Sequence, residues 1–222
     1  MKTLLSTCLL LAFFSPVASL ICMKCLGFAK GTCYPLGTET CQADEIFCLS
    51  FKMRNPTALL FEFSLKSCAP KGICKEGNFS STTAQDKHFQ SVMKCCKTHL
   101  CNKDPIELPP PNMTSNGLRC PACLSMGTSH CQAKTMAKCV GKETRCFNGS
   151  GFAKISLAGF PLFTFQQKIA FQGCVTPTSC KFEAPVTLST SITTISIDKF
   201  KCSNATKARF HLADSTISGS RE

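Results

Sequence analysis

Apolar and polar residues alternate over several short stretches of this chain, with the period of two that is typical of half-buried β-strands. Residues 59–65 place Leu and Phe on one strand face, and residues 163–171 do the same with Phe and Ile. Residues 189–202 are rich in Thr and Ile, which favour strands. No stretch keeps a helical period over three turns, so the pattern predicts an all-β fold.

The cysteines divide the chain into two copies of one unit. Successive intervals from Cys22 are 2, 7, 7, 6, 19, 5 and 20 residues, and those from Cys120 are 2, 7, 7, 6, 27, 5 and 21. Such agreement indicates an internal duplication. We therefore expect two β domains, at residues 20–103 and 119–206. The linker between them, residues 104–118, contains Pro109-Pro110-Pro111, which favours a stiff extended segment.

Both ends of the chain predict export. Residues 1–19 combine Lys2, an apolar run and small residues before a cleavage point after Ser19, as a secretory signal does, although a buried N-terminal helix is the alternative. The polar tail 207–222 lacks the hydrophobic stretch of a lipid-anchor signal. We expect a secreted, extracellular protein without a transmembrane segment or lipid anchor.

Cysteine usage and glycosylation motifs agree with export. The chain has 19 cysteines in 222 residues, and removal of Cys8 with the signal leaves an even number, which predicts nine disulfides in an oxidising compartment. Four Asn-x-Ser/Thr sequences become candidate glycosylation sites there: Asn78, Asn112, Asn148 and Asn204.

The cysteine series of the first copy closes with Cys95-Cys96, four residues and Cys101-Asn102. Together with the preceding spacings, this ending resembles a Ly6/uPAR domain, a three-finger β fold with a disulfide-knotted palm. The resemblance implies nine pairs: Cys22–Cys48, Cys25–Cys33, Cys41–Cys68, Cys74–Cys95, Cys96–Cys101, Cys120–Cys146, Cys123–Cys131, Cys139–Cys174 and Cys180–Cys202. The second copy departs from the pattern, because Ser203 stands where a partner of the last pair would fall.

A narrower likeness comes from the segments 116–121, 141–146 and Gly151-Phe152. With two domains and a Pro-rich linker, they are similar to the gamma-type phospholipase A2 inhibitors of snake serum and their mammalian Ly6/PLAUR relatives. This resemblance implies enzyme contact through the linker stretch 104–113. Its candidate contact residues are Ile106, Leu108, Pro109, Pro110 and Pro111, and Met113 is a further apolar group of this stretch. The alternative is that the linker only spaces the domains.

Catalytic and metal motifs are weak. The Cys-x-x-Cys pairs at residues 22–25 and 120–123 lack the helix that a redox dithiol needs, and each opens a disulfide framework rather than a zinc site. Cys95-Cys96-Lys-Thr-His99 resembles the catalytic helix of secreted phospholipases A2, but Leu100 replaces the aspartate that binds calcium there. We expect no enzyme, no metal and no cofactor.

The net charge of +12 is spread along the chain. Export argues against nucleic acid as a partner, so the charge indicates either a solvated surface or binding to anionic glycans or membranes. The Phe-rich strands are interpreted as core rather than as a ligand site.

The middle fingers are expected to turn near residues 53–56 and 157–162. The second tip is apolar through Leu157, Phe160 and Leu162, which indicates either a partner contact or packing on the other domain. Three functions stay open for this non-enzymatic binding protein. The leading one is inhibition of a secreted phospholipase A2; the others are a ligand of a cell-surface or matrix receptor and a binder of glycans or anionic membranes.

Overall fold

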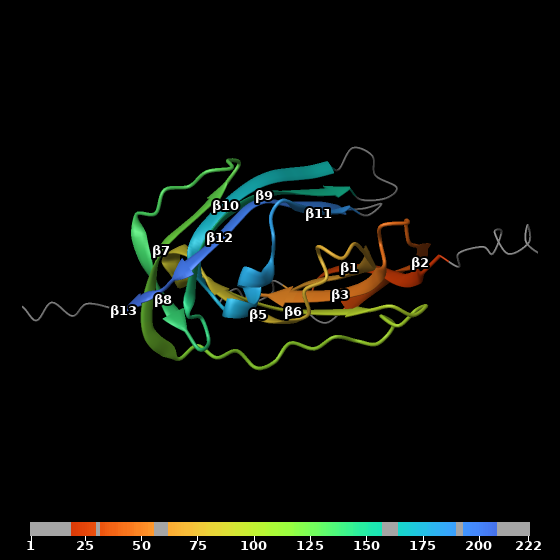
Figure 1. The fold of residues 1–222 in the computed structure, drawn as a ribbon, viewed down its shortest axis with the longest axis horizontal. Helices are drawn as coiled ribbons and strands as arrows, with labels where there is room; N and C mark the ends of the chain where they lie inside the picture. Colours follow the sequence, from red (N-terminus) through yellow and green to blue (C-terminus); the bar gives the residue numbers. More distant parts are fainter. Residues whose placement is uncertain (1–18, 30–31, 56–61, 157–163, 190–192, 208–222) are drawn as a thin grey trace, which may run out of the picture.

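The computed structural model describes residues 19–29, 32–55, 62–156, 164–189 and 193–207. In these ranges the chain forms thirteen β-strands and two short 3-10 helices, and it contains no α-helix. The predicted all-β fold is confirmed. Figure 1 shows the strands in an upper and a lower group that come together at the left end of the molecule. Residues 1–18 of the predicted signal segment lie outside the described residues, as do both predicted finger tips apart from residues 53–55.

Each copy of the cysteine repeat supplies three antiparallel hairpins. Domain 1 contains β1 (Ile21–Ala29), β2 (Thr32–Thr40), β3 (Phe47–Arg54), β4 (Glu62–Ala69), β5 (Gly77–Thr82) and β6 (His88–Cys96). Domain 2 contains β7 (Ser115–Met126), β8 (Thr135–Val140), β9 (Arg145–Ser156), β10 (Thr164–Val175), β11 (Val186–Ser189), β12 (Thr193–Asn204) and β13 (Thr206–Lys207). The 3-10 helices Ala84–Asp86 and Pro177–Lys181 come after β5 and β10.

The core of domain 1 lies on one face of its sheet. On β3, Leu49 is 1% exposed, and Phe51 and Met53 lie beyond it on the same face. Leu65 of the neighbouring β4 is 2% exposed in the same cluster. The opposite face carries polar residues such as Lys66, so the alternation of apolar and polar positions in the sequence decides which face of each strand is buried.

The two domains share one sheet, and domain 2 contributes residues to the core of domain 1. β5 of domain 1 pairs with β10 of domain 2 through Thr82 opposite Cys174 and Ser81 opposite Val175. Leu188 of β11 is 4% exposed within the core cluster of domain 1. Because each domain is too small to bury much apolar surface alone, this contact adds burial that neither domain has by itself.

Gly173 permits the close approach of β10 to β5. A Cβ atom on Gly173 would clash with the backbone oxygen of Thr82, which cannot move without breaking the strand pairing. We expect Gly173→Ala to lower the free energy of unfolding by about 1–3 kcal/mol, measured by guanidinium denaturation. Gly72→Ala is the matched control, because its nearest atom is a Val186 methyl at 3.3 Å, and should cost less. Equal costs for the two variants would contradict this role of Gly173.

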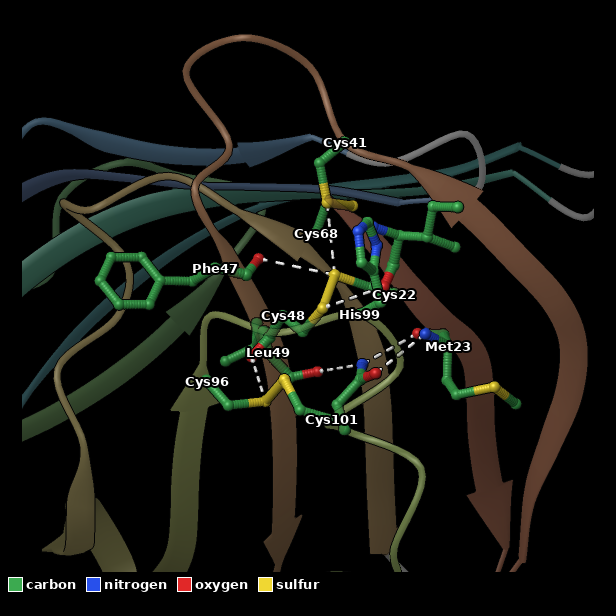
Figure 2. The surroundings of a disulfide bond; sticks show 12 residues. Cys22, Met23, Cys41, Phe47, Cys48, Leu49, Cys68, Cys96, His99 and Cys101 are labelled. Carbon is green, nitrogen blue, oxygen red and sulfur yellow. Dashed lines mark hydrogen bonds between the residues drawn. A yellow bond between two sulfur atoms is a disulfide. The ribbon is translucent and has the colours of Figure 1, made fainter. Parts of the chain in front are cut away.

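Nine disulfides knot the palms of the two domains. The structure joins Cys22–Cys48, Cys25–Cys33, Cys41–Cys68, Cys74–Cys95, Cys96–Cys101, Cys120–Cys146, Cys123–Cys131, Cys139–Cys174 and Cys180–Cys202. Two of them touch, with the sulfurs of Cys22 and Cys41 3.3 Å apart (Figure 2). Domain 2 repeats this contact at 3.7 Å between Cys120 and Cys139.

Candidate partner-binding surface

The linker starts from a buried anchor at the end of domain 1. Asn102 is 4% exposed, and its amide nitrogen donates to the backbone oxygens of Met23 (3.0 Å) and Leu49 (3.1 Å). Its side-chain oxygen accepts the N–H of Met23 at 2.8 Å. Because these bonds join β1, β3 and the closing loop, the chain leaves domain 1 in a fixed direction.

Two cations then hold the linker against the polar face of domain 1, along which it runs towards β7 (Figure 1). The ammonium group of Lys66 donates to the backbone oxygens of Lys103 and Asp104, both at 2.8 Å. Burial lowers the pKa of Lys66, and the nearby Asp104 partly opposes this shift. The guanidinium of Arg54 donates to the oxygen of Pro109 at 2.6 Å and to Gln90. The linker is therefore docked on domain 1.

This docking divides the linker residues into buried and accessible ones. Ile106 is 7% exposed and lines a pocket with Ser50 and Lys94, so little of its side chain is accessible. We therefore leave Ile106 out of the contact residues proposed below. Leu108 and Pro109 are half-buried, whereas Pro110, Pro111 and Met113 are exposed.

An exposed apolar patch that the sequence did not indicate lies on the first finger. Phe28, Tyr34 and Leu36 are 43%, 65% and 47% exposed on β1 and β2. The sequence signal is weak, because these residues lie among cysteines, glycines and prolines rather than in a clear alternating run. The predicted contact residues Leu157, Phe160 and Leu162 lie outside the described residues.

The sulfur clusters of the palms do not offer metal ligands. The sulfurs of Cys22, Cys41 and Cys68 lie within 4.8 Å of one another, but all three belong to disulfides. A disulfide sulfur has no thiolate charge to bind a cation. His99 is exposed in the loop that the Cys96–Cys101 disulfide closes, where its Nδ1 accepts the N–H of Ile21 at 3.1 Å (Figure 2).

A buried polar cluster between the domains also escaped prediction. Glu143, in the turn between β8 and β9, is 0% exposed, and its Oε1 lies 3.2 Å from Nδ1 of His88 on β6, which is 1% exposed. The same oxygen accepts the hydroxyl of Ser80 at 2.9 Å. Thr82 lies 3.1 Å from Nδ1 of His88. A carboxylate, an imidazole and a hydroxyl are also the groups of a catalytic triad, but Glu143 and His88 are too buried for a substrate to reach them. The cluster instead holds the two domains together, because Glu143 belongs to domain 2 and His88 and Ser80 belong to domain 1.

All four candidate glycosylation asparagines are exposed. Asn112 accepts the N–H of Thr114 through its side-chain oxygen at 3.0 Å, and Arg145 donates to the side chain of Asn204. Asn78 and Asn148 lie on β5 and β9. Their accessibility is compatible with glycosylation at each position.

These features define a class of disulfide-rich β protein with two knotted domains joined by a docked linker. The u-PAR/Ly-6 domain model matches residues 18–104 and 116–205, and the chain belongs to this family. The prediction of a non-enzymatic Ly6/uPAR protein is thereby confirmed. Within the described residues, no helix is long and apolar enough to cross a membrane.

Relatives of this chain align over both domains. It is 27% identical over 188 residues to phospholipase A2 inhibitor NAI of Notechis ater, with 81% of this chain and 86% of the inhibitor covered. It is 29% identical over 198 residues to protein RoBo-1 of Rattus norvegicus, covering 85% and 75%. Among solved structures, mouse TEX101 matches with a TM-score of 0.35 and 20% identity, covering 85% of this chain and 99% of TEX101.

Proposed function

We propose that this protein binds a secreted phospholipase A2 and inhibits it, with the exposed part of the linker as a contact segment. The supporting observation is the likeness to phospholipase A2 inhibitors, which spans both domains and the linker between them. The proposal uses an extracellular setting, which is typical of this disulfide-rich family.

The docked linker supports the proposal physically. Lys66 and Arg54 fix its backbone at both ends of residues 103–109, and three consecutive prolines stiffen residues 109–111. A segment that is already ordered loses little conformational entropy when a partner binds it. Its apolar groups, half-buried Leu108 and exposed Met113, can then contribute to binding with a small ordering cost.

Replacing Leu108 and Met113 by Ser tests this contact segment. We expect phospholipase A2 binding to weaken by about 1.5–3 kcal/mol per lost apolar anchor, and by less for partly buried Leu108. The measurement is a titration of the purified protein against a panel of secreted phospholipases A2 that follows both binding and hydrolysis. Met126→Ser is the matched control, because Met126 is 66% exposed on domain 2 and lies outside the linker.

Two outcomes would count against the proposal. Saturable binding that survives the linker changes would move the contact site elsewhere, whereas no binding to any enzyme of the panel would discard inhibition. The second result would favour a ligand of a cell-surface receptor. In that case the exposed Phe28, Tyr34 and Leu36 of the first finger are the surface to test first.

A further inference from the structure

Positive charge is concentrated on the surface of domain 2. Residues 119–206 contain ten Lys or Arg and three acids, and one of these acids, Glu143, is 0% exposed. Residues 20–103 contain eleven Lys or Arg and six acids. The surface of domain 2 therefore carries more net positive charge than that of domain 1.

Four lysines of domain 2 share one face of the sheet formed by β9, β10 and β12. Lys168 of β10 lies opposite Phe152 of β9, and Lys154 is two residues further along β9. Lys199 and Lys201 of β12 lie opposite positions 150 and 148 of β9. Because opposed residues and residues two apart point to the same side of a sheet, all four lysines point the same way. All four are exposed.

A β-bulge in β12 places two of these lysines on this face. The register shifts between Ile197, opposite Gly151, and Lys199, opposite Ser150. Without this extra residue the alternation beyond Ile197 would turn Lys199 and Lys201 to the opposite face, since a slip of one residue reverses every side chain. The bulge instead turns Phe200 inwards, where its ring stacks on Phe147 with centroids 5.9 Å apart.

The lysine face looks away from domain 1. Leu188 of β11 lies opposite Ile195, which is on the other face of the sheet, and is buried in the core of domain 1. β9 and β10 accordingly form the upper margin of the molecule in Figure 1. One acid, Asp198, lies at the bulge, and its carboxylate accepts the hydroxyl of Ser196 at 2.6 Å.

The chemistry of this face suits a polyanion better than a membrane. Among the described residues, none of the large exposed hydrophobic side chains lies on this face, and Phe152, which does lie on it, is half-buried. The face therefore offers little apolar surface for insertion into lipid. The exposed cations extend along about six residues of β9, or roughly 20 Å at about 3.4 Å per residue. An elongated row of cations matches an extended chain that carries sulfates at intervals.

We propose that this lysine face of domain 2, made of Lys154, Lys168, Lys199 and Lys201, binds sulfated glycosaminoglycan chains. The site is independent of the linker and of the proposed phospholipase A2 binding. It would retain the secreted protein on cell surfaces and matrix. Asn148 lies beside Lys201 on the same face, so an N-glycan there would cover part of the site.

The test measures heparin affinity of the full chain in an Asn148→Gln background, which removes any glycan from the face. The test variant carries both Lys199→Gln and Lys201→Gln. The control variant carries Lys71→Gln and Lys87→Gln, which remove the same charge from exposed positions of domain 1. We expect roughly fivefold weaker binding for each lysine lost from the face, and little change for the control pair. Desulfated heparin should not bind, and added salt should weaken the binding of heparin steeply.

Equal losses in the two double variants would show attraction by net charge alone and overturn the proposal. Binding to vesicles that contain phosphatidylserine, without binding to heparin, would also overturn it. Thermal melting of each variant excludes misfolding, since all four exchanged lysines are exposed.

Discussion

Glu143→Ala is expected to lower the free energy of unfolding by about 1–3 kcal/mol, the cost of leaving a buried polar group without its hydrogen-bond partner. Glu143 is 0% exposed and binds His88, Ser80 and the N–H of Val140. Its loss takes this carboxylate partner away from the buried imidazole of His88 and the half-buried hydroxyl of Ser80 at the junction of the two domains. Guanidinium denaturation of the full chain measures the change.

Domain 1 supplies the matched control for this experiment. Glu45 occupies the corresponding turn and accepts the N–H of Gln42 at 2.8 Å, as Glu143 accepts that of Val140, but this bond lies at the exposed surface. Glu45→Ala should therefore cost about 1 kcal/mol or less, the value of one hydrogen bond. If Glu143→Ala costs no more than Glu45→Ala, the cluster does not hold the domains together.

A double-mutant cycle separates the pair from its surroundings. His88→Ala and Glu143→Ala each remove the contact between these two side chains, so the double variant should cost less than the sum of the two single variants. Purely additive costs would mean that His88 and Glu143 are stabilised by other neighbours, such as Thr82 and Ser80.

The strands and the internal duplication could be predicted from local sequence, because both depend on spacings that the chain displays directly. A period of two in the apolar positions predicts the all-β class, and the same alternation places Leu49 on the buried face of β3. The connectivity of the cysteines could not be derived in this way, since many pairings satisfy the same spacings. Only the family resemblance implies it.

The contacts between the two domains could not be predicted from the sequence. His88 and Glu143 are 55 positions apart in the sequence, and each taken alone looks like an ordinary surface residue. Ile106 illustrates the same limit within the linker. Beside three prolines it resembled an exposed anchor, but the bonds from Lys66 and Arg54 to the backbone dock the linker and bury that side chain.

Removal of the Cys41–Cys68 disulfide by Ala substitutions should destabilise the protein by about 3.5 kcal/mol on the chain-entropy model, because it closes a loop with a sequence separation of 27. Cys41 also touches the sulfur of Cys22 at 3.3 Å inside the palm, so the change leaves a gap beside the Cys22–Cys48 disulfide. The same model gives about 2 kcal/mol for Cys96–Cys101, whose separation is 5.

The second domain explains why the smaller loss should be tolerated. Domain 2 has no counterpart of the Cys96–Cys101 disulfide. Its C-terminal end is held instead by β13, where Thr206 pairs with Arg119 of β7. In domain 1 the C-terminal end keeps the hydrogen bonds from Asn102 to Met23 and Leu49 even without the disulfide. Denaturation of the two double-Ala variants, with non-reducing peptide mapping of the remaining pairs, measures both effects. If removing Cys96–Cys101 lowers the free energy of unfolding more than removing Cys41–Cys68, then the C-terminal end of domain 1, rather than the stacked palm disulfides, limits the stability of that domain.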